Sequence, residues 1–196
     1  SYNQPIGKGV MALALVMVSI DNLENRNTQG DLIGTFSSSD IALNISYGVE
    51  LSSKFSFGSS FKIIQEKIDT YNANAFALDA GIVYKPKDKL TFGAVIQNVG
   101  TDITFINEAN QLPTLFKIGA GYMTMKNRLV LSLDVNNPID NQPYISAGAE
   151  YSLSLKKNMD ASIRAGYRTG LTVADISYGV GLRYEKFFLD LAMVPY

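Results

Sequence analysis

The chain has 196 residues, with 18 acidic and 17 basic side chains, and it contains neither cysteine nor histidine. With a net charge of −1, the charge balance gives no argument for nucleic-acid binding. The lack of cysteine excludes disulfides and thiolate chemistry, and the lack of histidine removes the commonest general base and transition-metal ligand. We therefore expect neither an enzyme nor a bound cofactor or metal.

No apolar run reaches the roughly 20 residues of a transmembrane helix. The longest run, from Val10 to Val18, is too short. It also lacks the flanks of a secretion signal, so we expect that signal to have been removed or the chain to begin within a longer protein. A hydrophobic fraction of 46% fits both a soluble β-protein and an outer-membrane barrel, because a polar lumen dilutes the apolar belt of a barrel.

The sequence predicts about eleven strands, most of about 9–13 residues, the length with which a tilted strand crosses a bilayer. Between Met159 and Tyr167, apolar residues occupy the odd positions, and polar residues or glycine occupy the even ones. Such alternation is typical of a strand with one apolar and one polar face. The predicted strands cover residues 8–20, 39–50, 54–66, 74–85, 89–98, 114–124, 128–136, 143–154, 158–168, 175–184 and 187–194.

Short and long connections alternate along the chain. This alternation is the pattern of outer-membrane barrels, whose short turns lie in the periplasm, and a soluble meander has no reason to keep it. The short connections are 51–53, 85–88, 125–127, 155–157 and 185–186. The long ones are 21–38, 67–73, 99–113, 137–142 and 169–174.

Aromatic residues gather beside the short turns, on the apolar faces of their strands. At a membrane interface such rings settle at the headgroup level, so we interpret them as an aromatic girdle. The alternative is that they form cross-strand pairs in the core of an ordinary sheet. The residues are Tyr47, Tyr84, Tyr122, Tyr151 and Tyr184 before the turns, and Phe55, Phe57, Phe92 and Phe187 after them.

Ionic side chains fall on the face opposite the apolar one, and we interpret them as the lining of a polar lumen. A Lys or Arg on the lipid side would cost about 2–4 kcal/mol at the midplane, so the register is strongly specified. The alternative is an acid–base pair of inward carboxylates, but nearby cations account for these charges without any chemistry. The residues are Lys62, Glu66, Asp79, Lys117, Asp134, Glu150, Arg164 and Arg183, with Asp190 on the same face.

Two segments depart from the pattern. The predicted strand 8–20 is apolar on both faces, so we expect it to touch something within the lumen or to line a hydrophobic pocket. The next connection holds the acidic residues Asp21, Glu24 and Asp31, which suggest a calcium-binding loop as one hypothesis. It lacks the glycine and the ligand spacing of a calcium loop, so we interpret it as a solvated loop.

The strand count places the two chain ends on opposite sides of the membrane. Single-chain bacterial barrels have even strand numbers, and a barrel must close to leave no open edge in lipid. We therefore expect residues 1–196 to be a partial barrel domain from which an odd number of strands is absent.

A string of short motifs runs through the chain. They are Phe61-Lys62, Glu66-Lys67-Ile68-Asp69, Tyr84-Lys85-Pro86, Phe92-Gly93, Gln97-Asn98-Val99-Gly100, Leu112-Pro113, Leu133-Asp134-Val135-Asn136 with Pro138, Gly148-Ala149-Glu150-Tyr151, Arg164-Ala165-Gly166-Tyr167, Gly181-Leu182-Arg183-Tyr184 and Val194-Pro195-Tyr196. In this order they resemble the PorV/PorQ family of bacterial outer-membrane proteins, which is similar to the FadL long-chain fatty-acid transporters.

The resemblance covers nearly the whole chain from about Gln4. It implies an all-β fold, an antiparallel transmembrane β-barrel in the bacterial outer membrane. About 14 strands form the complete barrel, and about 11 are expected here. The N-terminal plug with the first strands, and the closing C-terminal strand, would be missing. PorV-like members serve type IX secretion, carrying cargo from the translocon to a surface attachment complex.

Three functions follow as hypotheses. A secretion-associated barrel would bind protein partners or cargo through its outer loops and have a plugged lumen. A FadL-like transporter would carry a hydrophobic small molecule through an apolar pocket near Met11, Leu13 and Leu15 and a lateral opening. A soluble or structural β-protein would bury the tyrosines and need no detergent. We favour the first, with outer-membrane lipid and other secretion proteins as partners.

Overall fold

The computed structural model describes residues 1–156, 158–170 and 176–194 and consists of strands, turns and loops. The described residues contain no helix long and apolar enough to cross a membrane. The strands are β1 (Tyr2–Ile6), β2 (Gly9–Arg26), β3 (Leu32–Glu50), β4 (Phe55–Ile68), β5 (Tyr71–Lys87), β6 (Leu90–Gly100), β7 (Ile103–Phe105), β8 (Glu108–Asn110), β9 (Leu115–Thr124), β10 (Leu129–Pro138), β11 (Tyr144–Lys156), β12 (Met159–Arg168), β13 (Ile176–Tyr184) and β14 (Phe187–Met193).

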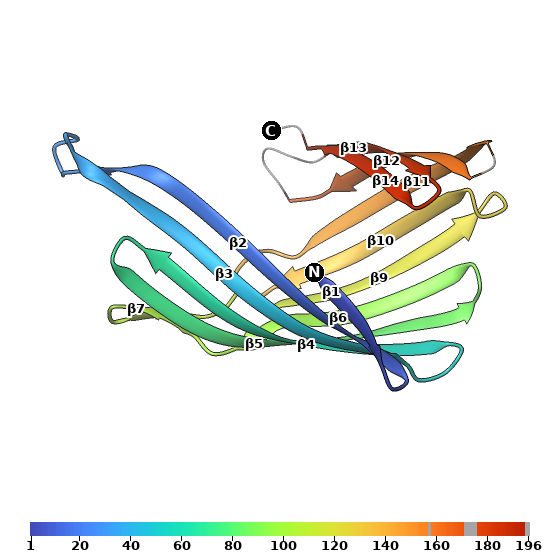
Figure 1. Ribbon diagram of the computed structural model, residues 1–196, viewed down its shortest axis with the longest axis horizontal. Coiled ribbons are helices and arrows are strands. Elements are labelled where there is room, and N and C mark those ends of the chain that lie inside the picture. The colour runs from blue at the N-terminus through green and yellow to red at the C-terminus, as the bar shows by residue number, and fades with distance from the viewer. Residues whose placement is uncertain (157, 171–175, 195–196) are drawn as a thin grey trace. The chain divides into compact units, whose positions relative to one another are not determined.

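Twelve of these strands form one antiparallel sheet in chain order, β1 to β6 followed by β9 to β14 (Figure 1). The small hairpin β7–β8 lies outside this order. The all-β antiparallel fold expected from the alternation is confirmed. The chain divides into two compact units, each described by itself below. Unit 1 comprises 1–50, 56–81 and 96–114, and unit 2 comprises 51–55, 82–95 and 115–196.

The two faces of the sheet differ in exposure as the alternation predicts. In β4 the odd positions from Phe55 to Gln65 are exposed, whereas the even ones from Ser56 to Glu66 are half-buried. In β12 Ile163 is 59% exposed on the apolar face, beside the half-buried Arg164 on the polar face. A lipid-facing surface requires large apolar side chains that point outward and are not buried by protein. We call the opposite, polar face the lumen face.

Several strand ends differ from the sequence expectation. β1 was not predicted, and β7 and β8 lie within the expected loop 99–113. The expected long connection 67–73 is wrong, because only Asp69 and Thr70 separate β4 from β5. The short-turn residue 157, the start of the predicted strand at 175, most of the expected loop 169–174 and the terminal motif residues 195–196 lie outside the described residues.

The expected loop 21–38 is largely strand. β2 continues to Arg26 and β3 begins at Leu32, and a register shift after Ile20 absorbs the polar residues that suggested a loop. Asn22 takes a φ of 59° at this bulge, a conformation that asparagine tolerates. The strands have 18 and 19 residues, against the 9–11 or so that cross a bilayer, so this ribbon is much longer than a membrane span.

With β1 included, the described residues contribute twelve strands to the main sheet, one more than the sequence predicts. The expected partial barrel domain stays a prediction. β1 has a weak sequence signal because it is short and carries Pro5, which disfavours an interior strand position. Its pairing with β2 covers only Gly9 to Leu13.

Replacing Leu133 by Lys tests the assignment of the two faces. Leu133 lies near the middle of β10 on the apolar face, where a cation would cost about 2–4 kcal/mol in lipid. We expect Leu133→Lys to lower the free energy of unfolding by that amount in denaturant titrations of the protein in lipid vesicles. Ser132→Lys, one residue away on the lumen face beside Asp134, is the matched control and should be tolerated. Equal losses for both variants would contradict the assignment.

Candidate functional site: the lumen face

In unit 1, a loop segment lies on the lumen face of the sheet. The buried cluster consists of Ala73, Ala75 and Ala77 from β5, with Ile103 of β7 and Leu112 from the segment after β8. Ile64 of β4 and Phe105 pack against it. The three alanines occupy alternate positions of one strand face, and their small side chains let the β6–β9 connection approach the sheet closely. The connection is therefore folded onto the lumen face.

A polar cluster of Lys62, Asp79 and Asn98 lies next to the buried alanines and holds the start of the β6–β9 connection. The Lys62 ammonium lies 2.6 Å from an Asp79 carboxylate oxygen and donates to Asn98 Oδ1 at 2.7 Å. The side chains of Lys62 and Asp79 are only 17% and 14% exposed. An ion pair this shielded from water depends on both partners, because removing one leaves the other charged and poorly solvated.

Asn98 is the centre of that cluster. Its backbone N–H donates to Asp79 at 2.8 Å, its side-chain amide donates to the Pro113 carbonyl at 3.0 Å, and its own carbonyl accepts from the Thr114 hydroxyl at 2.9 Å. Its φ of 59° is in the left-handed region, which bends the end of β6. Asn98 thus ties both ends of the 101–114 connection to the charged pair.

In unit 2, Arg164 of β12 joins three strands. Its Nε lies 2.6 Å from Glu150 of β11, and its Nη1 lies 2.5 Å from Asp190 of β14. Asp190 is two strands away, so the guanidinium must reach across β13. Gly181 of β13 provides the room, because a Cβ there would lie 2.6 Å from Asp190 Oδ1 and 2.5 Å from Ser162 Oγ.

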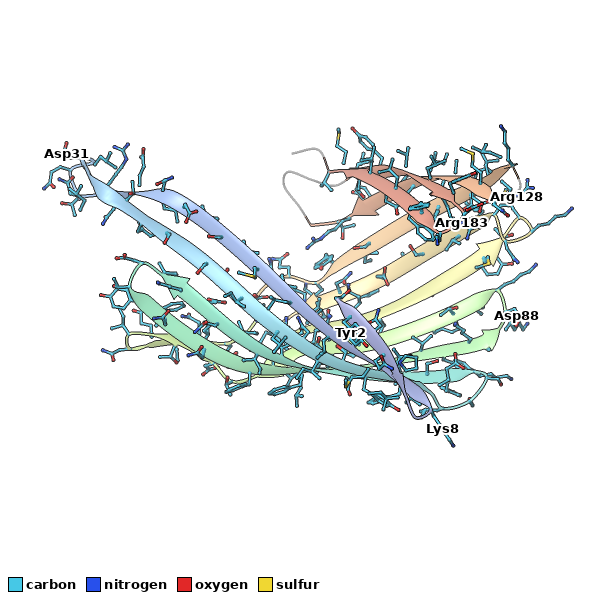
Figure 2. The ribbon with its side chains drawn as sticks, viewed as in Figure 1. Tyr2, Lys8, Asp31, Asp88, Arg128 and Arg183 are labelled. Atoms are coloured by element: carbon cyan, nitrogen blue, oxygen red, sulfur yellow. The ribbon has the colours of Figure 1, made fainter. Side chains whose placement is uncertain are left out.

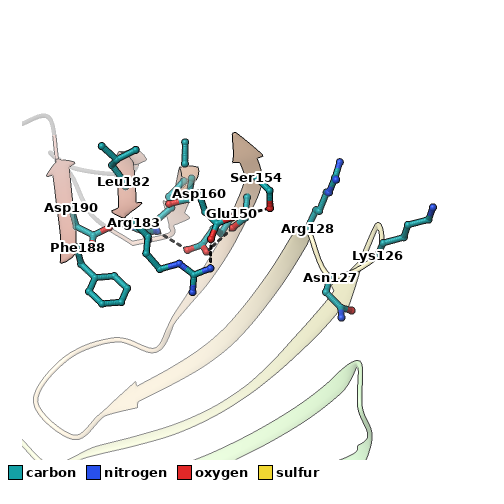
Figure 3. Close-up of a pocket in the computed structure, with 15 residues that line it drawn as sticks. Lys126, Asn127, Arg128, Glu150, Ser154, Asp160, Leu182, Arg183, Phe188 and Asp190 are labelled. Atoms are coloured by element: carbon teal, nitrogen blue, oxygen red, sulfur yellow. Dashed lines mark hydrogen bonds and ion pairs between the residues drawn. The ribbon is translucent and has the colours of Figure 1, made fainter. Parts of the chain in front are cut away.

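A second ion pair of unit 2 links β12 to β13. Arg183 pairs with Asp160, whose other oxygen accepts from the Ser154 hydroxyl at 2.8 Å. Both clusters border a hollow of about 560 Å³ on the lumen face. Figure 3 shows Arg183 beside Asp160, and Lys126 and Arg128 extending away from these pairs at the β9–β10 turn.

The other expected lumen residues are less connected. Glu66 stands opposite Asp40 in the β3–β4 register, and Asp134 stands opposite Gly119. No ion pair involves Glu66, Lys117 or Asp134 among the residues that the structure describes. Lys117 faces Asn136, which is 1% exposed and whose Oδ1 has no hydrogen-bond partner.

The residues expected to form the aromatic girdle lie on the outward face. Tyr84 stacks against Phe55 at a ring distance of 4.5 Å and against Phe92 at 6.5 Å. Tyr47, Tyr122 and Tyr184 are exposed, and Tyr84 and Tyr151 are half-buried. Phe55, Phe57, Phe92 and Phe187 are exposed. These rings are not enclosed by a protein core.

The alternation places Asp160 on the polar face of its strand with Arg164. Sequence reasoning missed Asn98 and Asn136 as parts of the lumen face. Asn98 and Asn136 are uncharged, and their role depends on contacts that alternation does not reveal. The acidic stretch considered for calcium uses its groups locally, with Glu24 2.7 Å from Arg26 and Asp31 accepting from Asn27.

Comparison with protein families identifies the chain. The family described as "Type IX secretion system membrane protein PorP/SprF" matches residues 26–194. The chain belongs to this family. The match confirms the association with type IX secretion. The family that matches is PorP/SprF, whereas the motif string resembles PorV/PorQ. The match describes a membrane protein of a secretion system and not an enzyme family. No curated protein matches the sequence of this PorP/SprF member.

Solved structures agree on the fold. The Pseudomonas putida toluene transporter TodX is similar with a TM-score of 0.65 and 12% identity, over 97% of this chain and 74% of TodX. A second TodX structure gives a TM-score of 0.67 and 11% identity, over 98% of this chain and 73% of TodX. The fold is thus that of FadL-like outer-membrane barrels, and this PorP/SprF chain is an outer-membrane protein.

Removing Lys62 tests the shielded ion pair. Lys62→Met leaves Asp79 charged with little access to water, so we expect a loss of about 3 kcal/mol in the free energy of unfolding. Lys62→Met combined with Asp79→Asn removes both charges and should recover part of that loss. Denaturant titration in micelles measures both. A double variant as unstable as Lys62→Met would show that the charge on Asp79 is not the cause.

Gly181→Ala tests the passage of Arg164 across β13. The added Cβ displaces Asp190 or Ser162, and we expect a loss of about 0.5–1 kcal/mol, the value of an accessible ion pair. The loss should be smaller in an Asp190→Asn background, where that pair is already gone. Gly121→Ala on β9 is the control, because its Cβ would meet only Leu131 O at 4.0 Å. Additive effects of Gly181→Ala and Asp190→Asn would refute the coupling.

Proposed function

We propose that this chain is a component of the type IX secretion system that binds protein partners or cargo at the cell surface rather than conducting a solute. In this role it would act as PorV-like proteins do, receiving cargo from the translocon and passing it to an attachment complex. The observation that supports this most is the 101–114 connection, which packs on the lumen face of unit 1.

The contacts of that connection argue against an open lumen. Ile103 and Leu112 are buried against three alanines, and the Lys62–Asp79–Asn98 cluster ties down the ends of the segment. Cross-strand ion pairs occupy the lumen face of unit 2. Moving the connection to open a path for solute in unit 1 would require its shielded contacts to break, so the protein is better suited to present surfaces than to transport.

The β2–β3 ribbon is the surface best placed to meet a partner. About eight residues of each strand exceed a membrane span, and its tip exposes Leu32 and Ile33. Exposed apolar side chains on an element beyond the bilayer favour contact with another protein. Figure 2 shows Asp31 at the end of this long strand pair.

A second candidate function is transport of a hydrophobic small molecule. An apolar hollow of about 220 Å³ lies near the expected position, lined by Met11 with Ile45, Tyr47, Phe61 and Leu78. These side chains occupy the apolar face of their strands, where membrane lipid already provides an apolar environment. The hollow is therefore weak support for transport. The folded connection gives stronger support for partner binding.

Affinity purification of the full-length protein after crosslinking in the native membrane tests the proposal. We expect other secretion components or cargo to copurify with the wild type. A ribbon-less variant, with residues 21–37 replaced by Asn-Gly between the paired Ile20 and Ser38, should lose a bound protein because its contact surface is gone. A copurifying lipid-like molecule without any protein would favour transport instead.

Conductance in planar bilayers tests the folded connection. We expect the wild type to conduct little, and a variant with residues 102–111 replaced by a short Gly-Ser linker to conduct at least several-fold more. Heat-modifiable migration in electrophoresis serves as the folding control for both proteins. High conductance in the wild type would contradict a lumen closed by this segment.

A further inference from the structure

Basic residues collect at one edge of unit 2. Besides the paired Asp160 and Arg183, the described turns and strand ends of unit 2 at this edge carry eight basic residues and two acidic ones, Asp88 and Glu185. The basic residues are Lys54, Lys85, Lys87, Lys89, Lys126, Arg128, Lys156 and Lys186. All of them are exposed. We call this set the basic rim.

Unit 1 has an acidic region of its own. Residues 21–40, 66–70 and 101–110 of this unit include eight acidic residues, and only Arg26 and Lys67 are basic. The acidic residues are Asp21, Glu24, Asp31, Asp40, Glu66, Asp69, Asp102 and Glu108. A net charge of −1 for the whole chain therefore conceals a basic edge in unit 2 and an acidic region in unit 1.

Backbone hydrogen bonds place the turns of the rim side by side. Lys85 N donates to Lys54 O at 2.8 Å, and Met123 N donates to Lys89 O at 2.8 Å. Ser152 N donates to Arg128 O at 2.7 Å, so the β9–β10 turn lies beside the end of β11. From β4 to β14 this edge crosses nine strands, or on the order of 40 Å at the usual strand spacing. The rim is thus a continuous array, too long for one small anion.

Several cations of the rim belong to the lumen side of their strands, whereas Lys156 stands opposite the outward Met159 after a register shift. Lys85 and Lys87 continue the alternate positions of Asp79, and Lys54 continues those of Lys62. Arg128 borders the lumen-face hollow directly. The outward positions at the same level hold aromatic rings such as Tyr84, which stacks between Phe55 and Phe92. At this level the aromatic rings therefore occupy outward positions, and Lys54, Lys85 and Lys87 occupy lumen positions.

The carboxylates nearest the rim do not neutralise it. In unit 2, Glu150 and Asp190 pair with Arg164, and Asp160 pairs with Arg183. None of the eight rim cations has an ion-pair partner within the described parts of the chain. Unpaired charges of one sign around a recess concentrate the local field and attract an oppositely charged partner.

We propose that the basic rim is a docking surface for an acidic segment of another polypeptide. Short turns of outer-membrane barrels face the periplasm, so the partner approaches from that side. The inward position of several rim cations argues against lipid headgroups, and the length of the rim argues against a small anion. The choice of a polypeptide rests on the proposed function in protein secretion.

Binding of a fluorescein-labelled twelve-residue polyglutamate peptide tests this surface. The full-length protein is placed in phosphatidylcholine nanodiscs, and fluorescence anisotropy measures the Kd. We expect Lys85→Gln/Lys87→Gln/Lys89→Gln to weaken binding about tenfold at low salt, because exposed charges act strongly when screening is weak. Arg26→Gln/Lys67→Gln/Arg168→Gln removes as many cations from the other strand ends and should change the Kd less than twofold.

The outcomes separate the possible occupants. If the triple rim variant fails to fold, Lys126→Gln/Arg128→Gln on the neighbouring turn should still weaken binding severalfold. Absence of wild-type binding at low salt, or equal weakening by both triple variants, overturns the proposal. Loss of peptide binding when the nanodiscs contain phosphatidylglycerol would assign the rim to lipid and overturn it as well.

A failure here is distinguishable from a failure of the proposed function. If the peptide does not bind but secretion proteins still copurify with the wild type, only the basic rim is wrong. If the peptide binds as expected and no protein copurifies from the native membrane, the proposed function fails while the electrostatic surface stands.

Discussion

Where the strands of the main sheet cross the membrane, they must present an apolar face to lipid while pairing their backbone polar groups with their neighbours. Hydrocarbon offers no hydrogen bonds, so the sheet ladder has to satisfy the backbone, and charged side chains are restricted to the other face. Period-two alternation meets both demands at once, because a single register fixes hydrogen bonding and side-chain direction together. The exposed Ile163 and the ion-paired Arg164, adjacent in β12, are the local expression of this constraint.

Charges confined to the lumen face then have to be compensated there. The chain does so by pairing across strands, and glycine provides the space where a pair must cross an intervening strand, as Gly181 does for Arg164 and Asp190. In unit 1 the same face holds a more shielded pair, Lys62 and Asp79, which also binds Asn98. Compensation of lumen charge and retention of the β6–β9 connection are therefore one arrangement in this unit.

Membership of the PorP/SprF family places these features in a membrane protein of the type IX secretion system. A secretion component works through contacts with other proteins, and a lumen face covered by its own connection is compatible with that role. The long β2–β3 ribbon and the basic rim offer two chemically different surfaces, one partly apolar and one cationic. The similarity to TodX concerns the barrel fold, which supports unrelated functions through differences in loops and lumen.

The sequence by itself determined the all-β class and the division of the strands into an apolar and a polar face, because alternation with a period of two is a local property. It did not determine the strand ends: the polar residues around Asn22 suggested a loop, whereas a bulge lets the ribbon continue. Only the tertiary structure decided which charges pair, that Asn98 ties the connection to Lys62 and Asp79, and that small alanines admit Ile103. Those contacts join residues distant in the chain, and no local pattern encodes them.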